Sequence, residues 1–335
     1  MALQLDADDA LSIYYNAFKG EPLFNGPVRE RFIRMPKATL WNQVRLPAAI
    51  ASDHCDVYFG GALVVPTLTR IPRVVVVHDC MSFRLPQSKS RRWAAYLRFW
   101  TRESARRSSI IICSSEWAAR ECTTFLGVER EKIRVVPAAV DRAFGPAEVT
   151  DRERIARHLA ARFDLHPPYV LQVGGYELHK GGDTAVEAVD LLRRRGRDVT
   201  LVRCGIRGPS AGGKNSTDLG YIDDPDLYAL YQSAAVVCVP STHEGFGLPL
   251  LEAMASGAPV VAARASSLPE VGGDVALYAE PGDPQSFAEA IDRLLVDTAD
   301  ADRRRQAGVR RAADFTWERT ASAVLELLRE AAAAS

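Results

Sequence analysis

The chain has 335 residues, more than one hydrophobic core organises comfortably, so two domains are expected. Its composition, 47% apolar and 25% charged, is typical of a soluble globular enzyme, and no apolar run reaches the roughly 18 residues of a membrane span. The net charge is zero, but residues 1–150 contain 21 Lys/Arg against 15 Asp/Glu (+6), and residues 151–335 contain 21 against 27 (−6). This imbalance fits two domains with different partners and is too small to indicate nucleic-acid binding.

The N-terminal residues are acidic and lack the basic and apolar regions of a signal peptide, which favours a cytoplasmic protein, with the inner face of a membrane as a further location. The cysteines form no C-x-x-C pair and several lie in strand-like runs, so they are expected to be reduced core residues and not metal ligands or disulfides. They are Cys55, Cys80, Cys113, Cys122, Cys204 and Cys238.

Strands and helices alternate in the first half of the chain. β-Branched runs predict strands at residues 73–79, 110–115 and 132–141, and helical spacing predicts helices at 94–108 and 116–127. This order indicates a parallel sheet covered by helices. Residues 142–168 are charged and end in a proline pair, which predicts a connection.

The alternation restarts in the second half. Strands are predicted at 169–175, 199–205, 235–241 and 258–263, helices at 182–196, 226–234 and 247–257, and a polar mobile loop at 208–218. Residues 315–331 form a last amphipathic helix, with Trp317 as a packing anchor. Two Rossmann-like, doubly wound parallel-sheet domains are therefore predicted.

The segment STHEGFGLPLLEAMASGAPVV (241–261) contains two carboxylates around a tight turn. The preceding strand brings Glu244 to the edge of the sheet where open α/β sheets bind ligands. Gly245 and Gly247 flank Phe246 and allow the backbone to approach a ligand closely.

A helix follows this turn directly. Amides of its first turn, at Gly247 and Leu248, are suited to a phosphate. Glu252 lies about a turn further on, where its carboxylate can accept two hydroxyl groups of a ribose. Together these groups match a ligand in which a sugar, a diphosphate and a nucleoside are linked in that order.

This segment closely resembles the E-x7-E signature of family 4 retaining glycosyltransferases. The resemblance implies a GT-B fold, with two Rossmann-like domains facing a cleft. It implies that Glu244, Gly245 and Phe246 contact the sugar of a nucleotide-diphospho-sugar, that Glu244 takes part in catalysis, and that Glu252 binds the ribose.

Two further stretches carry the same resemblance. YVLQVGGYELHKG (169–181) is similar to the family's diphosphate-binding loop, which implies contacts from Gly174, His179 and Lys180. Many members have Arg at the position of His179, and a histidine there is not always charged. VVVVHDC (74–80) implies that His78 is a catalytic residue of the cleft, with Asp79 orienting it or capping the next turn.

The resemblance implies three parts: an acceptor-side domain (1–150), a domain for the nucleotide-sugar (151–314) and a helix that crosses back to the first domain (315–335). The implied activity is hexosyl transfer with retention, of mannosyl or glucosyl type, from a GDP-, UDP- or ADP-sugar to a sugar, lipid or small-molecule acceptor in glycan, polysaccharide or glycolipid biosynthesis. No cofactor or metal is expected, because no D-x-D motif ends a strand. IDDPD (222–226) is interpreted as a helix N-cap.

The resemblance fails at the start of the chain. Family members begin with a strand and a glycine-rich loop, whereas residues 10–26 enter the fold after that point. The first strand is therefore expected to be missing, which would expose a sheet edge.

Residues 89–107 combine Arg98, Arg102 and Arg106 at helical spacing with several aromatic residues. One interpretation is a basic aromatic helix that contacts an anionic membrane and a lipid-linked acceptor. The other is an ordinary helix with its aromatic side chains in the core and its arginines in water.

Three other classes of protein remain as alternatives. A glycogen- or sucrose-type phosphorylase or synthase is disfavoured by the short chain. A NAD-dependent dehydrogenase is disfavoured because VGGYELHKG is not G-x-G-x-x-G. A truncated, weakly active or inactive GT-B-like nucleotide-binding or scaffold protein is supported by the unusual start.

Overall fold

The computed structural model describes residues 5–6, 9–17, 24, 28–84, 90–175, 177–205 and 215–334. The chain divides into two compact units. Unit 1 comprises residues 1–137 and 318–335, and unit 2 comprises residues 138–317. No helix in these described ranges is long and apolar enough to cross a bilayer.

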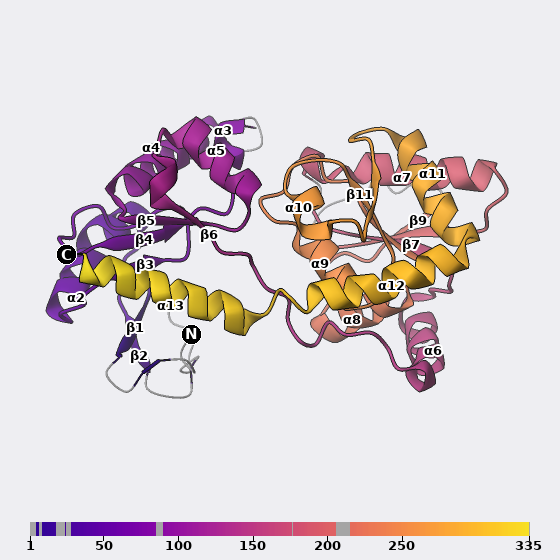
Figure 1. The fold of residues 1–335 in the computed structure, drawn as a ribbon, viewed down its shortest axis with the longest axis horizontal. Helices are drawn as coiled ribbons and strands as arrows, with labels where there is room; N and C mark the ends of the chain where they lie inside the picture. The colour runs from indigo at the N-terminus through magenta and orange to yellow at the C-terminus, as the bar shows by residue number, and fades with distance from the viewer. Residues whose placement is uncertain are drawn as a thin grey trace. The chain divides into compact units, whose positions relative to one another are not determined.

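Unit 1 contains a four-stranded parallel sheet in the order β3-β4-β5-β6 (Figure 1). These strands are β3 (Tyr58–Gly60), β4 (Arg73–Val76), β5 (Ile110–Cys113) and β6 (Ile133–Val135). Its helices are α1 (Ala38–Leu40), η2 (Trp41–Arg45), α2 (Leu46–Ser52), α3 (Met81–Arg84), α4 (Arg91–Arg107), α5 (Glu116–Leu126), η4 (Arg130–Lys132) and α13 (Trp317–Ala333).

The two faces of this sheet are covered by different helices. Val75, Ile111 and Cys113 face α4 and α5 and join a core that includes Ala105 and Ala118. The residues that alternate with them face α13, so both faces of the strands are apolar, as expected for a parallel sheet between two helical layers. Residues of this second core include Val74, Val76, Ile110, Ile112, Val324, Leu325 and Leu328. Figure 1 shows α13, in yellow, on the side of the sheet away from α4 and α5.

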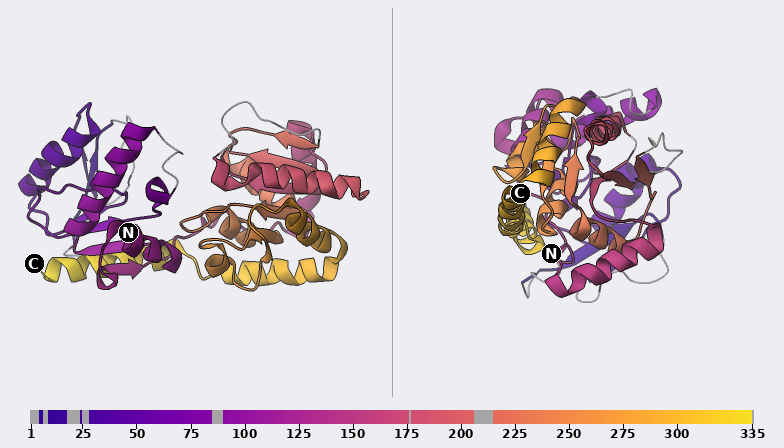
Figure 2. Two further views of the ribbon diagram at one scale, coloured as in Figure 1. Left: turned by 90° about the horizontal axis from the view of Figure 1, so that it is seen from above. Right: turned by 90° about the vertical axis from the view of Figure 1, so that its right-hand side faces the viewer.

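Unit 2 contains a six-stranded parallel sheet in the order β12-β11-β10-β7-β8-β9. Figure 2 shows this sheet and its helices from two further sides. Its strands are β7 (Tyr169–Val173), β8 (Thr200–Cys204), β9 (Ser216–Asp218), β10 (Val236–Val239), β11 (Val260–Ala263) and β12 (Leu277–Ala279). Its helices are η5 (Val149–Asp151), α6 (Arg152–Phe163), η6 (Leu178–Lys180), α7 (Gly182–Arg194), α8 (Asp224–Ser233), α9 (Leu248–Ala255), α10 (Leu268–Gly272), α11 (Pro284–Val296) and α12 (Thr298–Ala312).

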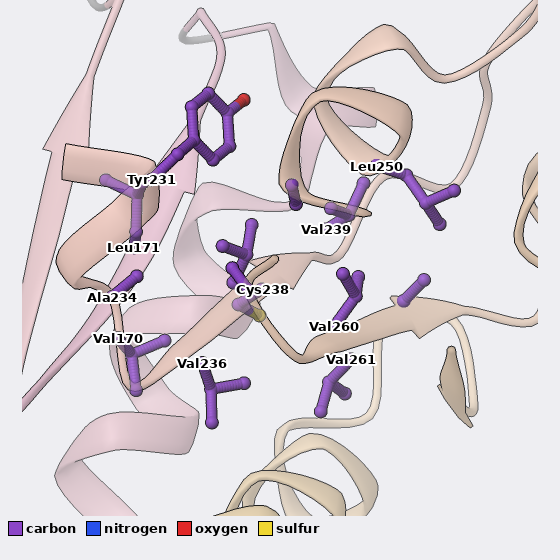
Figure 3. Packing of buried hydrophobic residues seen from close by; sticks show 14 of the residues in the cluster. Val170, Leu171, Tyr231, Ala234, Val236, Cys238, Val239, Leu250, Val260 and Val261 are labelled. Carbon is purple, nitrogen blue, oxygen red and sulfur yellow. The ribbon is translucent and has the colours of Figure 1, made fainter. Parts of the chain in front are cut away.

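The core of unit 2 surrounds the central strands β7, β10 and β11. Figure 3 shows its valine-rich centre, with Val170 and Leu171 beside Val236 and Cys238. These side chains are buried, which explains why the strands have continuous apolar sequences. The predicted α/β fold class is confirmed, and all six cysteines are free, with only Cys55 partly exposed.

Three local predictions were wrong. Residues 142–168 are not only a connection, because they contain helix α6, whose Ile155 and Leu159 pack into the core of unit 2. Within the predicted loop 208–218, Ser216–Asp218 pair with β8 as strand β9, while residues 206–214 lie outside the described residues. Trp317 is 55% exposed and is not a packing anchor.

The boundary between the units falls at residue 137, before the expected position at residue 150. The intervening residues belong to unit 2 because Phe144 packs edge-on against Tyr228 and Tyr231 of α8. The Gly145 carbonyl also accepts a 2.7 Å hydrogen bond from the side chain of Gln232.

The start of the chain contains β1 (Leu11–Tyr15) and β2 (Val28–Phe32), which pair with each other in parallel. In the described ranges these two strands form a separate sheet, and β3 lies at the edge of the four-stranded sheet. Parts of the unusual N-terminal stretch, residues 18–23 and 25–27, lie outside the described residues.

The packing of α13 predicts that unit 1 depends on this helix for stability. Leu325 is 7% exposed, so Leu325→Ala should lower the free energy of unfolding by about 2–4 kcal/mol through lost burial and a residual cavity. Leu68 in the same unit is 69% exposed and provides the control, because Leu68→Ala should have little effect. Urea denaturation measures both, and equal effects would contradict the packing of α13.

Candidate functional site

The strand order of unit 2 reverses between β7 and β10, which are neighbours in the sheet although β8 and β9 lie between them in sequence. The chain leaves these two strands toward opposite sides of the sheet. The loops at their carboxyl ends therefore border the position where open α/β sheets bind ligands. Lys180 follows β7, and Glu244 follows β10.

The two loops are in close contact. Gly181 has a φ of 66°, and a Cβ atom there would lie 2.4 Å from the carbonyl oxygen of Pro240, so only glycine fits. The amide of Thr242 donates a 2.7 Å hydrogen bond to the carbonyl of His179. The loop after β7 is thus held directly against the loop after β10.

Lys180 and Glu244 form an ion pair across these loops. The ammonium Nζ of Lys180 donates to Glu244 Oε1 at 2.8 Å, and the two side chains are only 22% and 12% exposed. Such a pair places one cation and one anion at the edge of the sheet and holds both in a defined position.

Two serines hold the backbone of the second loop. The amide of Glu244 donates to Ser266 Oγ at 2.9 Å. The hydroxyl of Ser267, which is buried, lies 2.9 Å from the carbonyl oxygen of Glu244 and 2.8 Å from that of Phe246. Neither serine was among the predicted site residues. The signal was the Ser-Ser pair between a buried strand and the Leu-Pro start of a helix.

The turn before α9 has the backbone geometry expected from its glycines. Gly247 has a φ of 105°, and a Cβ atom there would lie 2.7 Å from a methyl group of Leu268. The side chain of Phe246 is buried and packs against Phe315, with ring centroids 5.8 Å apart. Leu248 begins α9, and its amide, the first of the helix, has no acceptor within the helix, whereas the amide of Leu250 donates to the carbonyl of Gly247 at 3.1 Å.

Glu252 lies on α9, close to α8. Its Oε2 accepts a 2.8 Å hydrogen bond from the hydroxyl of Tyr231. Burial raises the pKa of the Glu252 carboxyl above its ordinary value of 4.5, and the nearby Asp224 raises it further, while the hydrogen bond from Tyr231 acts in the opposite direction.

His179, at the position of a possible second cation, favours its neutral form. Burial lowers the pKa of its imidazole below the ordinary value of 6.5, and the adjacent Lys180 lowers it further. Lys180 is therefore the principal cation of these two side chains at neutral pH.

Gly174, His78 and Asp79 are further predicted residues that the structure describes. Gly174 ends β7, and its amide donates to the carbonyl of Cys204 at 3.0 Å. His78 is exposed at the end of β4, in unit 1. Asp79 caps α3, because its Oδ1 accepts a 2.8 Å hydrogen bond from the amide of Met81. Tyr176, within the predicted diphosphate loop, lies outside the described residues.

The acids of residues 222–226 have structural partners. Asp223 accepts a hydrogen bond from the amide of Asp226 and caps α8, as predicted. Asp226 is buried and forms ion pairs with His158 and Arg162. Among the residues that the structure describes, there is no group of three His, Cys, Asp or Glu side chains that could hold a metal.

Both halves of the chain are similar to known protein families. Residues 7–144 match the model of Glycosyltransferase Family 4, and residues 156–311 match that of Glycosyl transferases group 1. The MMP alpha-(1->4)-mannosyltransferase of Mycolicibacterium hassiacum is 34% identical over 260 residues, which cover 72% of this chain and 59% of that protein.

Two solved structures share the fold. Sucrose-phosphate synthase from Thermosynechococcus elongatus superposes with a TM-score of 0.75 at 21% identity, over 97% of this chain and 89% of that one. Anabaena HepE in complex with UDP-glucose superposes with a TM-score of 0.71 at 20% identity, over 91% and 86%.

The fold is therefore that of the GT-B glycosyltransferases. Both halves of the chain are matched by glycosyltransferase models, which supports a family 4-type member of that class. It spans only about three fifths of the length of the mannosyltransferase relative.

The raised pKa of Glu252 predicts a stability cost. Because the folded state binds this proton more tightly than the unfolded state, stability falls as pH rises from about 4.5 through the folded-state pKa. Glu252→Gln removes the buried charge and should raise the melting temperature at pH 7 by about 1–4 °C. The gain should disappear below pH 4.5, where the carboxyl is protonated in both states.

Calorimetric melting from pH 4 to 8 measures this effect. Glu187→Gln on α7 is the matched control, since Glu187 is exposed and its substitution should change the melting temperature little at any pH. A lower melting temperature for Glu252→Gln at pH 7 would show that the carboxylate is not a destabilising buried charge.

Proposed function

We propose that this protein is a glycosyltransferase that moves a hexosyl group, of mannosyl or glucosyl type, from a nucleotide-diphospho-sugar to an acceptor in glycan or glycolipid biosynthesis. The observation that carries the proposal is the ion pair of Lys180 with Glu244 at the switch point of the sheet in unit 2, with Glu252 on α9, the helix that follows Glu244. A cation, the first turn of a helix and two carboxylates at one sheet edge suit a diphosphate flanked by two groups that bear hydroxyls.

The sugar donor is assigned to these groups one part at a time. Lys180, the backbone near Gly174 and the first-turn amides at Gly247 and Leu248 bind the diphosphate. Glu252 binds the ribose. The neutral preference of His179 makes it a hydrogen-bonding group for phosphate at neutral pH, with little charge of its own.

Glu244 and the backbone of the following turn bind the transferred sugar. Because the ring of Phe246 packs into the core, residue 246 contributes its backbone, as Gly245 does. The ion pair with Lys180 gives Glu244 a role in donor binding. When the diphosphate takes the ammonium of Lys180, the carboxylate of Glu244 becomes available to sugar hydroxyls.

The reaction breaks the bond from the anomeric carbon to the phosphate oxygen and forms a bond from that carbon to the acceptor oxygen. We propose that attack occurs on the face from which the diphosphate leaves, so that configuration is retained. The acceptor proton passes to the departing phosphate oxygen. Lys180 and the amides stabilise the growing charge, which is the largest contribution in many such sites, and no divalent metal is required. His78 is assigned to the acceptor side of the reaction.

Substitution of the two diphosphate- and ribose-binding residues tests this function. Lys180→Ala and Glu252→Ala should each weaken nucleotide binding or slow sugar transfer by more than about tenfold, through the loss of a charged hydrogen bond. Thermal shifts with UDP, GDP and ADP identify the base, and transfer from the matching nucleotide-sugar is then measured.

Lys37→Ala and Glu187→Ala remove exposed residues of the same types and should leave both readings unchanged. Near-wild-type transfer in both site variants would refute the site. Nucleotide binding without transfer or donor hydrolysis would favour the alternative, an inactive nucleotide-binding or scaffold protein.

We also propose that α4 contacts an anionic membrane where a lipid-linked acceptor lies. Small residues, such as Ala94 and Ala105, form the buried side of this helix. Trp93 and Phe99 are 48% and 58% exposed, so the alternative of an aromatic core face does not fit these two residues. Their rings join a chain of aromatic contacts through Tyr96 and Trp100.

The charge of α4 suits the same surface. The helix carries six arginines and one glutamate, a net charge of +5. Arg91 and Arg92 lie in its first turn, where positive charge opposes the helix dipole, so local helix stability does not account for them. Lys89, the first residue of the predicted basic segment, lies outside the described residues.

Co-sedimentation with vesicles tests the membrane contact. The protein should bind phosphatidylglycerol vesicles at low salt, and Trp93→Ala with Phe99→Ala should weaken binding by roughly tenfold or more, because exposed apolar area no longer enters the interface. Trp317→Ala is the control, since Trp317 is equally exposed on another helix. Equal binding to neutral vesicles, or no binding, would reject the proposal.

A further inference from the structure

The carboxylate of Glu252 is held by a buried tyrosine hydroxyl. Tyr231 on α8 is fully buried, and its hydroxyl donates to Glu252 Oε2 at 2.8 Å. Within the described part of the chain, the hydrogen bonds of this carboxylate include no protein donor to Oε1. One oxygen is thus anchored to the protein, and the other is left for a ligand.

We propose that Tyr231 is a positioning residue for nucleotide recognition: its hydroxyl fixes the Glu252 carboxylate so that it selects nucleotides with a ribose diol. The inference rests on the proposed function, in which Glu252 binds ribose. It adds a residue that touches no ligand and acts only through Glu252.

The packing around Tyr231 explains why its hydroxyl matters. The ring lies in the core of unit 2 (Figure 3). Phe144 packs edge-on against it, with ring centroids 5.7 Å apart. Phenylalanine would fill this space without burying a polar atom. A buried hydroxyl costs free energy unless it is hydrogen-bonded, and here the partner is Glu252.

A fixed carboxylate suits a diol. An ionised carboxylate has about four lone-pair positions, and two adjacent hydroxyl groups must meet these positions at defined directions. A long glutamate side chain free to rotate would lose conformational entropy on binding the ribose. The hydrogen bond from Tyr231 already restricts the Glu252 side chain in the free protein, so less conformational entropy is lost when the nucleotide binds.

The charges around Glu252 make the hydroxyl its favourable partner. Among the described residues, the titratable groups that shift the pKa of Glu252 are Tyr231 and Asp224, both on α8, and neither is a cation. Burial and Asp224 raise the pKa of Glu252, whereas the hydrogen bond from Tyr231 lowers it. The hydroxyl therefore favours the ionised form of the carboxylate, which accepts two hydroxyl groups.

The variant Tyr231→Phe, which keeps the ring, tests the inference. Calorimetry compares the preferred nucleotide among UDP, GDP and ADP with its 2′,3′-dideoxy analogue. The wild-type protein should prefer the ribonucleotide by roughly tenfold or more. In Tyr231→Phe, affinity for the ribonucleotide should fall about fivefold or more, while affinity for the dideoxy analogue changes by less than about twofold.

The pH dependence gives a second reading. Without the hydroxyl, the pKa of Glu252 should rise further, so ribonucleotide affinity should begin to fall at a higher pH on acidification than in the wild-type protein. Tyr228→Phe is the matched control, because Tyr228 lies on the same helix and contacts Phe144, and its nucleotide preference should match the wild type. Circular dichroism verifies that each variant is folded.

Glu252→Gln separates this inference from the proposed function. If Glu252→Gln retains the preference for the ribonucleotide, the ribose assignment itself fails. If Glu252→Gln abolishes the preference and Tyr231→Phe retains it, the role of Tyr231 is overturned while the ribose site stands. An equal loss of affinity for both nucleotides in Tyr231→Phe also overturns it, since that result indicates structural damage alone.

Discussion

The parallel pairing of β7 with β10 is the constraint on which the candidate site depends. Val170 and Leu171 pair with Val236 and Val237 at the centre of the six-stranded sheet. This pairing joins strands that are distant in sequence, and it brings Lys180 and Glu244, 64 positions apart, within 2.8 Å. Gly181 completes the contact, because no side chain would fit beside Pro240.

The charges of the site are balanced in different ways before any ligand is present. Lys180 and Glu244 neutralise each other in an ion pair, whereas Glu252 is half-buried with a neutral hydroxyl as its partner. Such an arrangement costs stability at Glu252, because a buried carboxylate without a cation is desolvated. Natural proteins retain costs of this kind where binding requires a charge in place.

The helices show how packing selects one side of an amphipathic sequence. On α13 the apolar side, with Leu325 and Leu328, covers one face of the unit 1 sheet. On α4 the buried side consists of small residues, and the large rings of Trp93 and Phe99 are turned outward. Both helices have apolar and polar residues at helical spacing, so spacing alone does not separate a core face from an interaction surface.

The local sequence was sufficient for the elements with continuous apolar runs and for the turn chemistry of residues 241–261. Buried parallel strands need apolar residues on both faces, and a strand-turn-helix needs its glycines at set positions. Each of these features can therefore be predicted from a single segment of the sequence. Glu244, Lys180 and Glu252 were predicted as site residues from such segments. The helix α6 was missed because only Ile155 and Leu159 of its charged sequence are buried.

The partners of the site residues depended on the folded chain. Ser266, Ser267 and Tyr231 reach Glu244, Phe246 and Glu252 across 20 or more positions, through a strand order that no local pattern specifies. Such contacts form only when elements distant in sequence pack together, and this is where the geometry of the site is set.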